Sequence, residues 1–185
     1  MSLETDRRDI LRLHRDWWLS NHGTNIPLMQ TCFPAGMSYL MFNLSSHPYF
    51  GIAEKTKLWE HYSSHIGIPH DPVARIMRIE INGDSAWLAC EGLFPVRKTG
   101  PEGTGTAAVA LSDADEPTWL RIRATEIYQR DDGEGRPVWK IWHLHASFLC
   151  PEDEPRPGFG DTSRQRGLGG NPWMEPLDVL GDRSL

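Results

Sequence analysis

The sequence predicts an α+β domain in which three helices pack on one curved antiparallel sheet and leave a conical cavity at its open end. Every stretch with helical character lies before residue 67, and four long strand patterns follow it. Helices that precede a run of strands are typical of this class. The chain also holds eight tryptophans, which can supply much of the buried area of a small core.

Three helices are expected in the N-terminal part of the chain. Residues 6–21 and 52–66 have the apolar spacing of amphipathic helices, and a short helix is expected over residues 26–31. Thr5 is placed to cap the first helix, and Gly23 is placed to end it. These helices form the layer that covers the sheet.

The strand patterns cover residues 37–43, 47–51, 73–81, 85–94, 119–130 and 139–147. Asn82-Gly83 joins two of them and is a strong hairpin signal, because both central positions of that tight turn need positive φ. A long Gly-rich connection is expected over residues 95–117. The domain is expected to span residues 1–150, and the Pro- and Gly-rich residues 151–185 predict an extended arm.

Composition narrows the choice of partners and compartment. The net charge of −6 and a pI near 5.7 argue against nucleic acid or an anionic membrane as a partner. No apolar stretch approaches the length of a membrane span, and the first residues lack a signal-peptide pattern. The three cysteines are odd in number and far apart, which predicts a reduced, cytoplasmic protein and excludes a zinc knuckle.

The segment Trp139–Ser147 carries two titratable side chains on a strongly β-favouring stretch. Because side chains on a strand alternate between faces, one face is expected to hold Trp139, Ile141, His143, His145 and Ser147. His143 and His145 could serve as acid and base near neutral pH, or be structural histidines of a central strand. A metal site would need a third ligand such as His47 or Glu91, and no feature fixes one nearby, so none is predicted.

Further candidates lie on neighbouring strands. Glu91 interrupts an apolar run, which favours either a paired carboxylate or a proton-transfer role, and Gly92 leaves space beside it. Arg123 could hold a phenolate or a developing oxyanion, or form a surface ion pair. Tyr39 offers a hydroxyl on an apolar body. The residues expected to bind a substrate are Trp17, Trp18, Phe42, His47, Tyr49 and Trp59.

Several segments resemble SnoaL-like domains of the nuclear transport factor 2-like superfamily: Leu11–Trp18, Asn43–Gly51, Leu58–Glu60, Gly83–Ala89 and Ala124–Gly133. The strand Trp139–Ser147 is also similar to the closing strand of these domains and of calmodulin-dependent kinase association domains. The chain departs from the association domains at Gly92, where they carry a pocket arginine. The resemblance covers roughly residues 5–150 and implies a conical α+β fold in a homodimer or higher homo-oligomer.

The same resemblance implies a chemistry. The group includes scytalone-type dehydratases and lignin-derived diarylpropane lyases, so a cofactor-independent lyase or dehydratase for an apolar aromatic molecule is expected. One histidine of the pair His143 and His145 would assist a leaving hydroxyl, and Glu91 or the other histidine would take a second proton. Arg123 or Tyr39 would hold a phenolic oxygen while water or formaldehyde leaves through a quinone methide.

Two other classes of function stay open at this stage. An isomerase or polyketide-type cyclase would use the same groups as base and oxyanion donors. A non-catalytic ligand-binding or assembly domain would need only the cavity or the outer sheet face. The Gly-rich stretch Gly100–Gly105 lacks a preceding strand–helix unit, so it does not predict a dinucleotide site, and no cofactor is expected.

Overall fold

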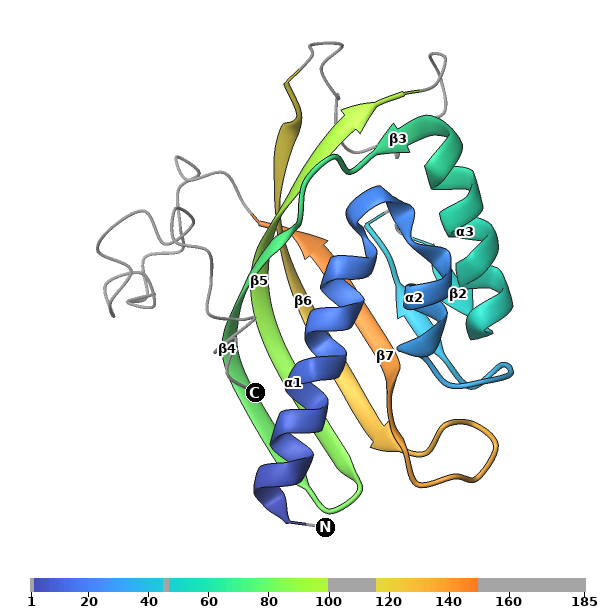
Figure 1. Cartoon of the computed structure of the whole chain (residues 1–185), viewed down its shortest axis with the longest axis vertical. Helices are drawn as coiled ribbons and strands as arrows, with labels where there is room; N and C mark the ends of the chain where they lie inside the picture. The colour runs from blue at the N-terminus through green and yellow to red at the C-terminus, as the bar shows by residue number, and fades with distance from the viewer. Residues whose placement is uncertain (1, 45–46, 100–115, 150–185) are drawn as a thin grey trace, which may run out of the picture.

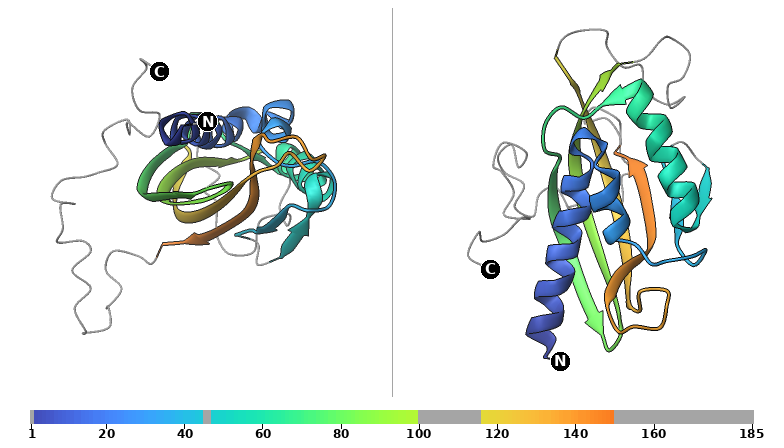
Figure 2. Two further views of the ribbon diagram at one scale, coloured as in Figure 1. Left: turned by 90° about the horizontal axis from the view of Figure 1, so that it is seen from below. Right: turned by 45° about the vertical axis from the view of Figure 1, so that its right-hand side comes forward.

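The computed structural model describes residues 2–44, 47–99 and 116–149. Helices α1 (Leu3–Ser20), α2 (Ile26–Thr31) and α3 (Gly51–His65) cover the concave side of a strongly curled sheet (Figure 1 and Figure 2). A one-turn 3-10 helix, η1 (His22–Thr24), links the first two helices. The predicted α+β class and its three helices are therefore confirmed. The predicted arm at residues 151–185 lies outside the described residues, as does most of the Gly-rich connection.

The sheet has seven strands: β1 (Leu40–Phe42), β2 (Pro48–Phe50), β3 (Ile66–Gly67), β4 (Val73–Asn82), β5 (Ser85–Lys98), β6 (Thr118–Arg130) and β7 (Trp139–Phe148). Their order is β2-β1-β7-β6-β5-β3, and β4 also pairs with β5. All pairings are antiparallel except β1 with β7, so the sheet is mixed at one place rather than wholly antiparallel. A long stretch of chain separates these two strands, so no tight turn sets their relative direction.

The ends of the elements follow local hydrogen bonds. Helix α1 begins earlier than predicted, because the Ser2 hydroxyl, and not that of Thr5, caps it by accepting from the backbone N–H of Thr5 at 3.2 Å. The short helix α2 has the predicted bounds, and Asn25 caps it. Gly83 has φ of 61°, as the predicted hairpin turn between β4 and β5 requires. No helix among the described residues is both long and apolar enough to cross a membrane.

A β-bulge in β7 decides which of its side chains face the helices. Ile127 of β6 lies opposite His143, whereas the next residue, Tyr128, lies opposite Ile141, so Trp142 is the extra residue. Ile141 is fully buried before the bulge and Leu144 is buried after it. The face predicted to hold both Trp139 and the two histidines is thus split, because the bulge exchanges the inner and outer positions.

Candidate functional site

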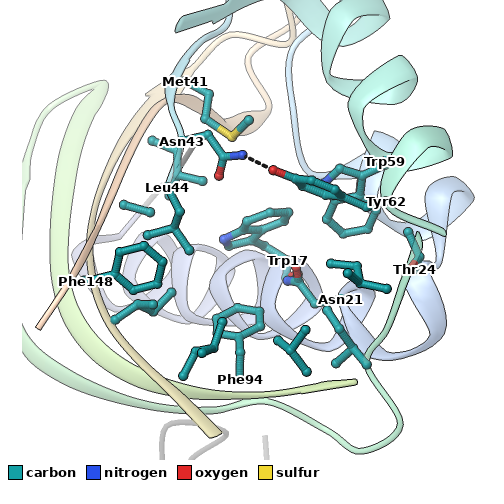
Figure 3. Close-up of a pocket in the computed structure, with 17 residues that line it drawn as sticks. Trp17, Asn21, Thr24, Met41, Asn43, Leu44, Trp59, Tyr62, Phe94 and Phe148 are labelled. Carbon is teal, nitrogen blue, oxygen red and sulfur yellow. Dashed lines mark hydrogen bonds between the residues drawn. The ribbon is translucent and has the colours of Figure 1, made fainter. Parts of the chain in front are cut away.

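An open pocket lies at one end of the curled sheet, between α1, α3 and the strands β5, β6 and β7 (Figure 3). We call it the cone pocket. Its cavity volume is about 120 Å³, and open space at its mouth adds to this. Aromatic and aliphatic side chains make up most of its wall: Trp17, Met41, Leu44, Trp59, Ile66, Ile68, Phe94, Val96, Leu120, Ile122, Leu144, Ala146 and Phe148. A ligand that fills it must therefore be largely apolar.

A few polar side chains interrupt this wall. The Asn43 amide donates to the hydroxyl of Tyr62 at 2.7 Å, and the pair lies at one side of the cavity (Figure 3). Asn21 also lines the pocket, but its amide donates to the carbonyl of Trp17 at 3.0 Å and so helps to end α1. Thr24 completes the polar group. The Asn43–Tyr62 pair is thus placed to orient one polar end of an apolar ligand.

A buried polar cluster lies behind the wall of the cone pocket. Leu144 lines the pocket, and Glu126 is its cross-strand neighbour on β6. The Glu126 carboxylate accepts hydrogen bonds from His14 Nδ1 at 2.8 Å, from Trp18 Nε1 at 3.0 Å and from the hydroxyl of Tyr128. These four side chains, which we call the Glu126 cluster, are all buried. A buried carboxylate requires such partners, because an isolated charge in the core is very unfavourable.

One ring nitrogen of the Glu126 cluster has no hydrogen-bond partner in the part of the chain that the structure describes. His14 Nδ1 donates to Glu126, and His14 Nε2 is buried without a hydrogen-bond partner among the described residues. Burial and the neighbouring Glu126 raise the pKa of Tyr128 well above its usual range, so its hydroxyl stays a donor. With Nδ1 engaged by Glu126, Nε2 is the ring nitrogen that is left for a proton or a ligand atom.

A thiol lies beside the same cluster. Cys90, His14 and Glu126 each place one ligand atom within 4.8 Å of the others, a donor set that Zn²⁺ would accept. Both oxygens of Glu126, however, already accept hydrogen bonds from buried donors. Burial also raises the pKa of the Cys90 thiol well above its usual range, so it stays protonated. We interpret the group as a hydrogen-bonded network.

A second buried ionisable group stands behind the pocket wall. Lys55 on α3 is fully buried, and its Nζ lies 3.3 Å from the hydroxyl of Tyr39 and 3.3 Å from the sulfur of Met41. Burial lowers the pKa of Lys55 well below its usual range. The pKa of Tyr39 is raised well above its usual range, also chiefly by burial. Tyr39 is therefore uncharged near neutral pH, and the neutral amine of Lys55 is favoured more than in an exposed lysine.

The sequence-predicted tryptophans meet at the pocket and its floor. Trp17 and Trp59 line the cone pocket, with ring centroids 5.5 Å apart. Trp18 lies one layer deeper and donates to Glu126. The space expected beside Gly92 is filled by Trp18, because a Cβ at Gly92 would come within 2.3 Å of its ring. That space is therefore not open to a ligand.

The other predicted site residues lie away from the cone pocket lining. Glu91 and Arg123 are opposite each other on adjacent strands, on the outer face of the sheet. His145 is exposed and lines a hollow at the rim, and Phe42 lies between it and His143, with ring centroids 5.7 and 5.3 Å away.

The pKa of His143 is lowered, chiefly by partial burial. His47 is exposed, and Tyr49 packs against the edge of the core. Tyr39 is buried beside Lys55. The catalytic or binding roles assigned to these residues from the sequence stay predictions.

Three buried polar residues of this region were not predicted from the sequence, although the position of each in its apolar pattern indicates burial. Glu126 interrupts an otherwise apolar strand face, and such a carboxylate needs buried partners. His14 lies four residues before Trp18 and four after Ile10, on the buried side of α1. Lys55 has the same spacing before Trp59 on α3. Each is a polar residue at an apolar position of its element.

Comparison with known proteins identifies the architecture. No family model and no curated protein matches the chain. A nuclear transport factor 2-like protein from Salmonella enterica superposes with a TM-score of 0.62 at 12% identity, covering 86% of this chain and 99% of that one. A ketosteroid isomerase-like protein from Erwinia carotovora gives a TM-score of 0.58 at 10% identity, covering 78% and 96%.

A protein from Streptomyces avermitilis, named as a candidate dehydratase of the same family, gives a TM-score of 0.56 at 13% identity. It is matched over its whole length and over 81% of this chain. Sequence identities this low are evidence for a shared fold and not for a shared function. The helices over a curled sheet, the cavity at its open end and these superpositions together show that the chain has the nuclear transport factor 2-like fold.

Proposed function

We propose that the protein is a cofactor-independent acid–base enzyme of the lyase or dehydratase type, acting on a small aromatic molecule in the cone pocket. The observation that carries this proposal is the position of the His14–Glu126 pair behind the wall of an apolar, aromatic pocket, where Glu126 is the cross-strand neighbour of the lining residue Leu144. The apolar wall binds the ring of the ligand, and the pair supplies the proton acceptor.

The chemistry follows from the tautomer of His14. Glu126 accepts from Nδ1, which leaves Nε2 to take a proton from a carbon of the bound molecule. His14 is buried behind the lining, so the wall must yield locally for the two atoms to meet. The electron pair left on that carbon forms a double bond while a hydroxyl on the next carbon leaves as water. Asn43 and Tyr62 would hold a ligand oxygen at the other side of the cavity. Phenolic dimers of the lignin type carry the apolar rings that such a wall would bind, and they can lose water or formaldehyde through a quinone methide.

Binding is tested by filling the cavity. Ala146 lines the cone pocket, and Thr125 is exposed on the outer face of the same sheet. We expect Ala146→Phe to abolish the thermal stabilisation given by a panel of phenolic dimers, and Thr125→Phe to preserve it, since stabilisation follows affinity for the folded state. Equal stabilisation of both variants would place the ligand elsewhere.

Catalysis is tested at His14. Asn reproduces the half of the imidazole that carries Nδ1, so His14→Asn keeps a donor to Glu126 and deletes Nε2. Turnover of any substrate found in the panel should fall by about 10²- to 10⁴-fold, the usual contribution of a general base. The thermal stabilisation by that substrate should persist. Undiminished turnover would exclude His14 as the base.

A non-catalytic ligand-binding domain is the second candidate. Among the described residues that line the cone pocket, Tyr62 alone carries a titratable side chain. Binding without turnover across the panel would favour this reading. The expected homo-oligomer and cytoplasmic location stay predictions beside either function.

A further inference from the structure

Lys55 is held in a cage of aromatic rings and one thioether, which we call the Lys55 cage. Its Nζ lies 4.2 Å from the ring centroid of Trp17 and 4.4 Å from that of Phe33. The rings of Tyr39 and Trp59 follow at 5.2 and 5.7 Å. No carboxylate among the described residues forms an ion pair with this amine. A fully buried lysine without such a partner is rare in a protein core.

The cage acts differently on the two forms of the amine. Removal from water disfavours the ammonium and lowers the pKa of Lys55, which favours the neutral amine with its lone pair. Ring faces, in contrast, attract any positive charge placed on the nitrogen. The site therefore holds a neutral nucleophile and also favours a cation that is formed on the same atom.

The amine is separated from the cone pocket by the thickness of one side chain. Trp17, Met41 and Trp59 line the pocket and also contact Lys55 in its cage. A rotation of Met41, an unbranched and flexible side chain, would open a path between the two. No lysine is itself among the described residues that line the pocket, and Lys55 is the one that contacts three lining side chains.

We propose that Lys55 is a carbonyl-capturing amine, which forms an imine with an aldehyde or ketone held in the cone pocket. The nitrogen lone pair attacks the carbonyl carbon, and the carbonyl oxygen takes a proton to give a carbinolamine. Loss of that oxygen as water leaves a C=N bond, whose protonated form carries its positive charge within the ring faces. The hydroxyl of Tyr39, 3.3 Å from Nζ, is placed to carry the proton. No oxidant, reductant or cofactor is required.

Imine formation at Lys55 rests on the pocket of the proposed function but not on its reaction. It gives the pocket a ligand class, aromatic carbonyl compounds, for which the His14–Glu126 pair has no preference. Such a compound could be substrate, product or inhibitor of the same cavity. The test therefore measures adduct formation at Lys55 and pocket occupancy separately.

The experiment traps the imine in the full-length protein with 4-hydroxybenzaldehyde and cyanoborohydride at pH 7, followed by peptide mapping. Lys57, two residues along α3 and exposed, is the internal control. An ordinary lysine, with a pKa of about 10.4, is neutral in only about one molecule in 2,500 at pH 7. We expect Lys55 to be reduced to the benzylamine at least about tenfold faster than Lys57 for that reason, and both to react equally in denaturant.

Two further arms separate the possible failures. Ala146→Phe should block the adduct at Lys55 and leave labelling of Lys57 unchanged. 4-Methylphenol, which has no carbonyl, should compete with the aldehyde and raise the melting temperature if the pocket binds phenols. Stabilisation by 4-methylphenol without any adduct at Lys55 would overturn the imine proposal and leave the proposed function standing. Adduct formation at Lys55 with no turnover of any phenolic dimer would support the imine proposal and argue against the proposed function.

Discussion

The two faces of β6 show how burial changes what a polar or charged side chain must do. The outer face carries Arg123 and Thr125, both exposed to solvent. The inner face carries Ile122, Ala124 and Glu126, and the single carboxylate there accepts hydrogen bonds from three buried donors. A charged side chain in water needs no partner in the protein. A buried one is stable only if it is hydrogen-bonded or paired, or if it becomes neutral. The inner face is therefore where this fold can produce unusual chemistry.

The strongest test of this contrast replaces one carboxylate on each face. Glu126→Gln keeps the volume but turns an amide N–H₂ toward donors that now lack an acceptor. We expect the free energy of unfolding to fall by about 3 kcal/mol or more, the usual result of leaving buried donors unsatisfied. Glu91→Gln, on the outer face, should change it by about 0.5 kcal/mol or less. Urea denaturation measures both, and similar losses would contradict the contrast.

Packing beneath the cone pocket gives the second test. A Cβ at Gly92 would meet a ring carbon of Trp18 at 2.3 Å and the backbone oxygen of Val73 at 2.8 Å. Gly92→Ala should therefore destabilise the protein by about 1–3 kcal/mol, the usual cost of overpacking a core. The loss should exceed that of Ala89→Val, at a half-buried position of the outer face of β5. A stable Gly92→Ala variant would mean that Trp18 has room to move.

The sequence predicted the order and type of the main helices and strands, because their periodicity and turn residues are local signals. It missed the short strand β3, whose Ile66 falls within a predicted helix, and the last residues of β5, which fall within the predicted Gly-rich connection. It could not predict which face of β7 points inward. The bulge at Trp142 depends on pairing with β6, and one extra residue exchanges every later position between the faces. For this reason His143 and His145 lie outside the cone pocket, while Leu144 lines it.

The candidate site was less predictable than the fold for a related reason. Residue type alone suggests that His14, Lys55 and Glu126 lie at the surface. Their positions in the apolar pattern of their helices and strand indicate burial, and this second signal is the correct one. The partners that allow their burial come from residues far away in the chain, as in the bond between His14 and Glu126. Only the assembled fold brings such pairs together.

The third prediction concerns the neutral state of Lys55. Its folded pKa is lowered, whereas the unfolded chain binds a proton below about pH 10.4. The unfolded state thus holds more protons near neutral pH, so wild-type stability rises as the pH rises toward that value. Lys55→Met removes this dependence and should raise the free energy of unfolding at pH 7 by about 1 kcal/mol. A loss of stability at pH 7 would indicate a charged amine and argue against its nucleophilic role.

The smallest expected effect lies at the end of the sheet opposite the cone pocket, where an ion pair joins the two layers. Arg130 donates to both oxygens of Asp6 at 2.6 and 2.8 Å, and Trp139 Nε1 donates to the same carboxylate at 3.1 Å. The hydrogen bonds from Arg130 and then from Trp139 lower the pKa of Asp6.

A depressed carboxylate pKa stabilises the fold above its unfolded value, about 3.9, and this contribution is lost as the pH falls through the folded value. The difference in free energy of unfolding between wild type and Asp6→Asn should therefore be constant near neutral pH and shrink below about pH 4. Urea titrations from pH 7 to about pH 3 measure it. A difference that persists unchanged at the acid end would show that α1 is held there by packing rather than by the charge of Asp6.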